Sequence, residues 1–422
     1  MKIKTKCLPY EQVMSLPRVP HRRPRRPWWL FRTIIRVGSI PDLFATRFTF
    51  TRHRMEQAGK GPWLVLMNHS SFIDLKIASR ILYPKPFFIV CTSDGFVGKN
   101  WLMRQIGCIP TQKFVSDLTL IRDMLHALKK EKSSVLMYPE AGYSLDGTAT
   151  PLPRKLGVLL KKLDVPVVSI ITEGAFARDP LYNCLQLRKV KVSARVECLL
   201  TQEEIRERSV QELDDCLDRV FSFDNFAWQA QNKVAVNEPF RADGLHRILY
   251  RCPKCGAEGL MEGKGIHLTC HACGKQYELT PYGQLCATEG ETEFPHIPDW
   301  FSWQREQVRR QILAGEYSLD TEVDIGLIVD HKALYLVGSG RLTHTSAGFT
   351  LTGCDEKLHY TQSSSSAYEL NVDYFWYEMG DMISIGDRNC LYYCFPKDPS
   401  VSVTKARLAA EVLYQMAKSS KS

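Results

Sequence analysis

A histidine and an aspartate close together in the chain could perform acid–base chemistry on a bound alcohol. The stretch Leu66-Met-Asn-His-Ser-Ser-Phe-Ile-Asp74 runs from an apolar strand through a polar turn into an amphipathic helix. His69 stands in the turn and Asp74 at the start of the helix, at a strand end where α/β sheets place ligands. A carboxylate that folds back onto an imidazole fixes its tautomer and raises its basicity. The spacing predicts His69 as a general base oriented by Asp74, although a structural histidine would give the same pattern.

Further polar groups follow other predicted strands. Ser134-Val-Leu-Met-Tyr-Pro-Glu-Ala-Gly-Tyr-Ser144 is an apolar strand that ends in a Pro-Glu turn, which brings Glu140 to the same edge of the sheet as His69. Between the two stretches lies Gly107-Cys-Ile-Pro-Thr-Gln-Lys113, and after them Val165-Pro-Val-Val168. No Ser or Cys occupies a Gly-flanked nucleophile elbow, so the sequence does not suggest a covalent acyl-enzyme.

Together these four pieces resemble the glycerolipid acyltransferase family, over about residues 55–220. The family's Asn-His-x-x-x-x-Asp motif is matched in full, and its Phe-Pro-Glu-Gly-Thr-Arg-Ser motif is matched in part by residues 138–144. The resemblance implies direct transfer of an acyl group from coenzyme A or acyl carrier protein to a lipid hydroxyl. It implies that His69 and Asp74 are catalytic, and that the substrate-binding residues are Asn68, Gly107, Lys113, Glu140, Ser144 and Lys155.

The departures from the family pattern concern the acceptor. The family's Gly-Thr-Arg reads Ala141-Gly142-Tyr143, and the arginine of its second motif is Lys113. A guanidinium grips phosphate through a planar fork, whereas lysine offers a point charge and tyrosine neither. The resemblance implies 1-acylglycerol-3-phosphate as acceptor, in phospholipid synthesis, with Lys113, Arg154 and Lys155 as sources of charge. A phosphate-free or glycolipid acceptor is the alternative.

Four cysteines have the spacing of a metal site. Cys252-Pro-Lys-Cys255 and Cys270-His-Ala-Cys273 are two C-x-x-C pairs, each followed by a glycine. The pattern predicts a zinc ribbon with four thiolate ligands and no open coordination position, so the zinc is expected to be structural. Two unrelated redox pairs are the alternative. The ribbon is expected at residues 247–285, and its sparse aromatic residues favour an interaction or spacer role over nucleic-acid binding.

The elements that would position these groups form three parts. Apolar strands at 63–67, 87–91, 135–138 and 165–171 alternate with amphipathic helices at 72–82, 118–130 and 156–163, which predicts an α/β domain with a mostly parallel sheet. The resemblance implies that this is the acyltransferase domain, expected at residues 55–235. Residues 202–235 are expected to be helical. Residues 300–422 are expected to form a β-rich domain closed by a helix at 403–416. That element order is similar to a pleckstrin-homology barrel.

The net charge of +9 is concentrated near the N-terminus. Residues 18–54 hold ten arginines and one acidic residue, Asp42. Such a segment favours an anionic partner. Residues 1–26 are expected to form a tail or surface arm, and 28–37 an amphipathic helix that lies in a membrane interface or packs on the domain. Residues 1–54 are therefore predicted to be a basic arm with a membrane-interface segment.

The rest of the composition bears on location. No apolar run approaches the roughly 18 residues that span a bilayer, and no secretory signal is visible, so the other ten cysteines are expected to be reduced thiols. These features predict a cytoplasmic protein, peripheral at the inner face of the membrane, with nucleic acid a disfavoured partner. A non-catalytic membrane or nucleic-acid adaptor is the alternative from another functional class.

Overall fold

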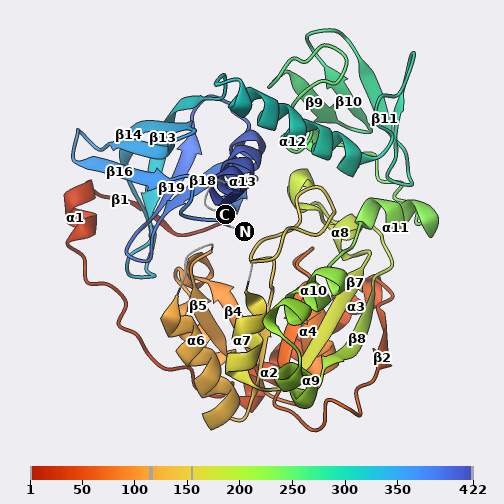
Figure 1. Ribbon diagram of the computed structural model, residues 1–422, viewed down its shortest axis with the longest axis vertical. Coiled ribbons are helices and arrows are strands. Elements are labelled where there is room, and N and C mark those ends of the chain that lie inside the picture. Colours follow the sequence, from red (N-terminus) through yellow and green to blue (C-terminus); the bar gives the residue numbers. More distant parts are fainter. Residues whose placement is uncertain (1, 114–116, 154, 420–422) are drawn as a thin grey trace.

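The computed structural model describes residues 2–113, 117–153 and 155–419. In Figure 1 an α/β domain forms the lower half of the molecule. A β-rich domain lies above it on the left and a small ribbon on the right. A long helix, α12 (Ile297–Leu313), runs between these two upper parts.

The α/β domain is built on a seven-stranded sheet. Its strand order is β2-β8-β7-β3-β6-β4-β5. Five of the six pairings are parallel, and only β7 and β8 run antiparallel. The strands are β2 (Thr49–His53), β3 (Leu64–Met67), β4 (Phe87–Thr92), β5 (Cys108–Thr111), β6 (Ser134–Met137), β7 (Val167–Glu173) and β8 (Ser193–Leu200).

Both faces of this sheet are buried, which explains the continuous apolar runs of its strands. Along β3, Val65 and Met67 pack in the same cluster as helix α4 (Asp74–Leu82). Leu64 and Leu66 pack in the opposite cluster, with α6 (Leu118–Leu125), α7 (Leu156–Leu163) and α10 (Val210–Val220). The remaining helices here are α2 (Trp29–Gly38), α3 (Ile40–Ala45), α5 (Asn100–Gln105), α8 (Ala175–Arg178), α9 (Gln202–Glu207) and α11 (Asn225–Gln231), with a π-helical turn at His126–Lys130 and 3-10 turns at Ser93–Phe96 and Leu181–Asn183.

The four predicted strands and three predicted helices of this domain are confirmed. The helix at 156–163 matches α7 at both ends, the helix at 118–130 is α6 continued by the π-helical turn, and the other elements differ by at most two residues at an end. The helical character expected for 202–235 is confirmed as α9, α10 and α11. The sequence signals here are strong because capping boxes begin α9 and α10, at Thr201 and Ser209.

The ribbon is a four-stranded antiparallel sheet that packs on α12. Its order is β12-β11-β10-β9, with β9 (Met261–Lys264), β10 (His267–Cys270), β11 (Gln276–Leu279) and β12 (Leu285–Ala287). Helix α12 was not predicted from the sequence, and the boundary expected for the β-rich domain, residue 300, falls inside it. Its apolar residues Ile297, Trp300, Val308 and Ile312 are buried at helical spacing and mark one face.

The β-rich domain has seven antiparallel strands in the order β16-β15-β14-β13-β19-β18-β17. Helix α13 (Val403–Ser419) confirms the predicted C-terminal helix. The likeness to a pleckstrin-homology barrel stays a prediction. The strands are β13 (Leu319–Leu327), β14 (Leu334–Thr345), β15 (Gly348–Gly353), β16 (Leu358–Ser363), β17 (Asn371–Asp373), β18 (Met382–Gly386) and β19 (Leu391–Pro396), with a 3-10 turn at Trp376–Glu378. A further 3-10 turn, Leu245–Arg247, precedes the ribbon.

The N-terminal segment joins this domain. Strand β1 (Thr5–Cys7) pairs in parallel with β14, and helix α1 (Tyr10–Met14) buries Val13 in the same core. Beyond α1 the chain runs down to the α/β domain (Figure 1), where His21 Nε2 lies 3.1 Å from an Asp123 carboxylate oxygen. The expected surface arm therefore applies to residues 15–26 and not to residues 2–14.

One continuous core ties the parts together. A single cluster of buried apolar side chains includes Phe226 of the α/β domain, Tyr277 of the ribbon, Trp300 of α12 and Val323 of the β-rich domain. Hydrogen bonds add to it: Gln304 donates to Ile248 O and Gln229 to Pro281 O. The ribbon therefore braces the α/β domain against the β-rich domain.

Candidate active site and metal centre

His69 and Asp74 meet at the carboxyl end of β3. The Asp74 Oδ2 atom lies 2.9 Å from His69 Nδ1 and accepts the backbone N–H groups of Ser70 and Ser71 at 3.0 and 3.1 Å. Asp74 is buried, so its carboxylate is held rigidly at the first turn of α4. A carboxylate only accepts hydrogen bonds, so Nδ1 carries the proton. The Nε2 lone pair is then available to a substrate.

Burial and the aspartate act in opposite directions on this imidazole. Desolvation is the larger effect and lowers the pKa of His69 below its usual value, although the hydrogen bond and charge of Asp74 raise it. Lys113 lowers it further through its positive charge. The imidazole is therefore neutral at neutral pH, which is the form that can accept a proton.

Two tyrosines sandwich the histidine ring. The rings of Tyr138 and Tyr143 stack on His69, each with its centroid 3.9 Å away. Phe72 extends the group beyond Tyr143. The side chain of His69 keeps 19% of its surface exposed, so its edge is accessible while both faces are covered. The sequence analysis noted Tyr143 only as a departure from the family motif and did not predict the stack.

Glu140 lies in the same turn as Tyr143 and links this turn to His69 by a hydrogen bond. Its Oε1 accepts His69 N at 3.3 Å, and its Oε2 accepts both N and Oγ1 of Thr150. Burial raises the pKa of Glu140 to about 8, against these hydrogen bonds, which favour the charged form. In this structure both carboxylate oxygens of Glu140 therefore accept hydrogen bonds from protein groups.

Asn68 and Ser144 also contact the protein rather than open space. The Asn68 amide exchanges hydrogen bonds with the backbone of Thr172 at the end of β7. The Ser144 hydroxyl donates to Thr148 O, and Ser144 N donates to His69 O. Both residues lie beside His69 and fix the two strand ends that flank it.

The other three predicted substrate-binding residues are placed differently. Gly107 lies at the amino end of β5, at the sheet edge opposite His69, and a Cβ there would come within 2.4 Å of Pro27. Lys113 follows the carboxyl end of β5 and lines a cavity together with Tyr143. Lys155 is exposed at the start of α7, where its N–H donates to Asp214. Arg154 lies outside the described residues.

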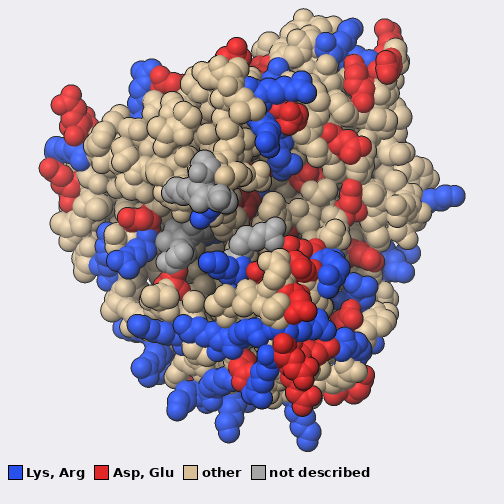
Figure 2. All heavy atoms as spheres, in the orientation of Figure 1, with Lys and Arg blue, Asp and Glu red and all other residues tan. Residues whose placement is uncertain are grey.

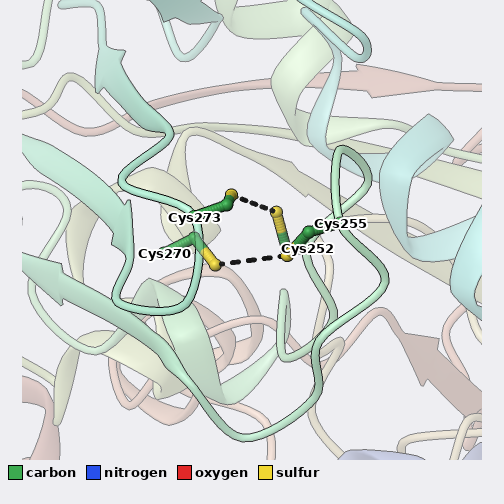
Figure 3. Close-up of side chains that lie close together, drawn as sticks. All are labelled: Cys252, Cys255, Cys270 and Cys273. Atoms are coloured by element: carbon green, nitrogen blue, oxygen red, sulfur yellow. Dashed lines mark hydrogen bonds between the residues drawn. The ribbon is translucent and has the colours of Figure 1, made fainter.

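The four predicted metal ligands converge. The Sγ atoms of Cys252, Cys255, Cys270 and Cys273 all lie within 4.8 Å of one another (Figure 3). The Cys252–Cys273 and Cys255–Cys270 sulfur distances are 3.8 and 3.7 Å. A zinc ion with four sulfurs at about 2.3 Å requires sulfur–sulfur distances of about 3.8 Å. All fourteen cysteines are free, so the quartet is not two disulfides.

The set therefore fits a tetrahedral zinc ion, which would hold the two knuckles of the ribbon together. With four protein ligands, such a site leaves no position for substrate. We assign it no part in the chemistry.

Comparison with known proteins gives two findings. Residues 47–173 match the family model described as Acyltransferase. Among solved structures, the 1-acyl-sn-glycerophosphate (LPA) acyltransferase PlsC from Thermotoga maritima matches with 17% identity over 45% of this chain and 76% of that chain, at a TM-score of 0.36. A superposition of that quality supports no conclusion about fold or activity. The family match contains His69, Asp74, Lys113 and Glu140, so residues 47–173 are an acyltransferase-family segment of this chain.

Proposed function

We propose that the protein transfers a fatty acyl group from a thioester carrier, acyl-coenzyme A or acyl carrier protein, to a hydroxyl of a lysolipid. The observation that carries the proposal is the His69–Asp74 pair: Nδ1 is bound to the carboxylate, Nε2 has no partner among the residues that the structure describes, and the side chain is 19% exposed. The family match over the same residues supports it.

In the proposed reaction His69 Nε2 removes the proton of the acceptor hydroxyl while its oxygen attacks the thioester carbonyl. Asp74 stabilises the imidazolium that forms. Among the described residues, the N–H groups of Gly142 and Tyr143 have no hydrogen-bond partner, and they are the donors we assign to the oxyanion. When the intermediate collapses, the thiolate leaves and takes the proton from the imidazolium.

Different observations favour two different acceptors. The sequence resemblance implies 1-acylglycerol-3-phosphate, the compound after which the Thermotoga maritima enzyme is named. Tyr143 in place of an arginine beside His69 favours an acceptor without a phosphomonoester. Incubating the protein with acyl-coenzyme A or acyl carrier protein and a panel of lysolipids, with mass-spectrometric detection of products, identifies the acceptor. No acylated product from any combination would contradict the proposal.

The pH dependence tests the state of the histidine. Because burial lowers the pKa of His69, kcat/KM is expected to rise with pH to an inflection below 6.5 and to stay constant through pH 7.5. The profile is measured with a soluble acyl-coenzyme A at saturating acceptor. An acid inflection above 7 would mean that Asp74 stabilises the imidazolium more than burial disfavours it.

We further propose that the protein docks on an anionic membrane surface through the side formed by α2, α3 and α5, where α2 contacts α3 and Phe31 contacts Trp101. Helix α2 has no fully buried residue, and large apolar side chains near it are exposed: Trp29 by 60%, Phe44 by 84% and Trp101 by 66%. Lys and Arg side chains gather along the lower part of the molecule (Figure 2), and Arg22, Arg23, Arg25 and Arg26 of the arm are exposed. Among the described residues, no helix is long and apolar enough to cross a bilayer.

Vesicle binding is expected to weaken with added salt and with loss of anionic lipid, because each basic residue near such a surface contributes about 1 kcal/mol. Phe44→Ala should weaken binding about tenfold in a co-sedimentation assay. Leu313→Ala, which removes an exposed side chain from α12, should not. Equal binding to neutral vesicles at high salt would contradict the electrostatic part of the proposal.

A further inference from the structure

The β-rich domain forms one wall of a cavity beside the candidate active site. The cavity is narrow in this structure, and the roughly 250 Å³ of empty space around it includes open solvent. Lys113 and Tyr143 line it from the acyltransferase domain, and Asn371, Asp373 and Arg407 line it from β17 and α13. The last three lie outside the family match at 47–173, so they belong to a part of this chain that the family motif does not describe.

The cavity is close to the proposed base. Tyr143 lines it and also stacks on His69 with the ring centroids 3.9 Å apart. The charge of Lys113 acts on both His69 and Asp373, which places all three in one electrostatic environment. A lipid headgroup in the cavity would therefore hold a neighbouring hydroxyl near the imidazole.

Some charged side chains of the cavity walls already have partners of opposite charge, and others do not. Arg407 contacts Glu369 and donates to Glu411 at 3.1 Å, so two carboxylates already surround its guanidinium. The Asp373 carboxylate accepts one backbone N–H, from Tyr374 at 2.9 Å. Among the described residues, Lys113 and Asp373 are thus the cation and the anion left to meet a ligand.

We infer that this cavity receives the acceptor's headgroup and that Lys113 and Asp373 select a zwitterionic one, with a phosphodiester near Lys113 and an ammonium near Asp373. The inference rests on the proposed acyltransferase function. Burial raises the pKa of Asp373 to about 7, and an ammonium beside it would hold the carboxylate in its charged form. A phosphomonoester would bring a second negative charge next to Asp373. An uncharged polyol would lie beside Lys113 and Asp373 and would offer neither of them an opposite charge.

Steady-state kinetics on the full chain test the selection. Wild-type protein, Asp373→Asn and the exposed control Asp355→Asn are assayed with acyl-coenzyme A and three acceptors: lysophosphatidylethanolamine, lysophosphatidic acid and monoacylglycerol. We expect the wild type and the control to prefer lysophosphatidylethanolamine. Asp373→Asn should raise its KM about tenfold and lower that of lysophosphatidic acid. A wild-type preference for either other acceptor, or an unchanged ratio in Asp373→Asn, overturns the inference.

A binding measurement separates this inference from the proposed function. Ligand-observed NMR with glycerophosphoethanolamine and glycerol 3-phosphate needs no turnover. Saturable binding of the first alone, weakened in Asp373→Asn, supports the headgroup site even if no acyl product forms. Equal binding of both compounds, or binding that Asp373→Asn does not change, overturns the site whether or not acyl transfer occurs.

Discussion

Asp74→Asn is expected to lower kcat by about 10² to 10⁴-fold, the range in which general-base catalysis contributes. The variant removes the charge that stabilises the imidazolium of His69. If its amide turns toward Nδ1, it also donates where Asp74 accepts, which moves the ring proton to Nε2 and removes the base. If its oxygen keeps the place of Oδ2, the new NH₂ group replaces Oδ1, a buried atom without a partner among the described residues. That placement costs about 1–3 kcal/mol of stability.

The measurement is kcat from thiol release, with thermal unfolding recorded in parallel. The matched control Asp355→Asn changes the same chemical group at an exposed turn and should leave kcat unchanged. A folded Asp74→Asn protein with wild-type kcat would show that the aspartate does not support the base. Loss of activity with a large loss of stability would call for Asp74→Glu, which keeps the charge.

Loss of the metal site is expected to have the largest effect on stability. Cys270 is fully buried, and the ribbon packs on α12, where Tyr277 and Trp300 meet edge to face. Cys270→Ser should cost on the order of 5 kcal/mol. At the size of this chain that lowers Tm by about 6 °C. Because Trp300 lies in the core shared by the ribbon and both domains, its fluorescence should shift to the red.

The control for this experiment is Cys286→Ser, an exposed cysteine on β12 of the same ribbon. It should retain the wild-type Tm and one zinc per chain by elemental analysis, whereas Cys270→Ser should lose the metal. If the purified wild-type protein holds no zinc, or if Cys270→Ser melts at the wild-type temperature, the structural metal site is wrong.

Most elements of the acyltransferase domain could be predicted from the sequence, because the patterns that indicate them are local. Strand β3 is a continuous apolar run, since both faces of the sheet are covered, and the caps at Thr201 and Ser209 mark helix starts. His69 and Asp74 are five positions apart, so their contact depends on one turn. The cysteine quartet was predictable for the same reason.

What the sequence did not reveal depends on long-range packing. The stack of Tyr143 on His69 joins two turns from different strands, and Ala141 reaches the required turn with a positive φ of 57°, where the family pattern has glycine. Strand β1 is three exposed residues whose only strand signal is its partner β14. Asp373 approaches the site from the β-rich domain, and no local pattern connects it with Lys113. Of these features, only α12 could have been predicted, because its apolar residues recur at helical spacing.

The central claim is that His69 activates a lipid hydroxyl for attack on a thioester. The most direct test follows coenzyme A release and ester formation together, with wild type and His69→Ala, for the acceptor that the panel identifies. We expect one acylated lipid for each coenzyme A released by the wild type, and neither product above background from a folded His69→Ala protein. Equal ester formation by the variant, or coenzyme A release without any acylated lipid, would contradict it.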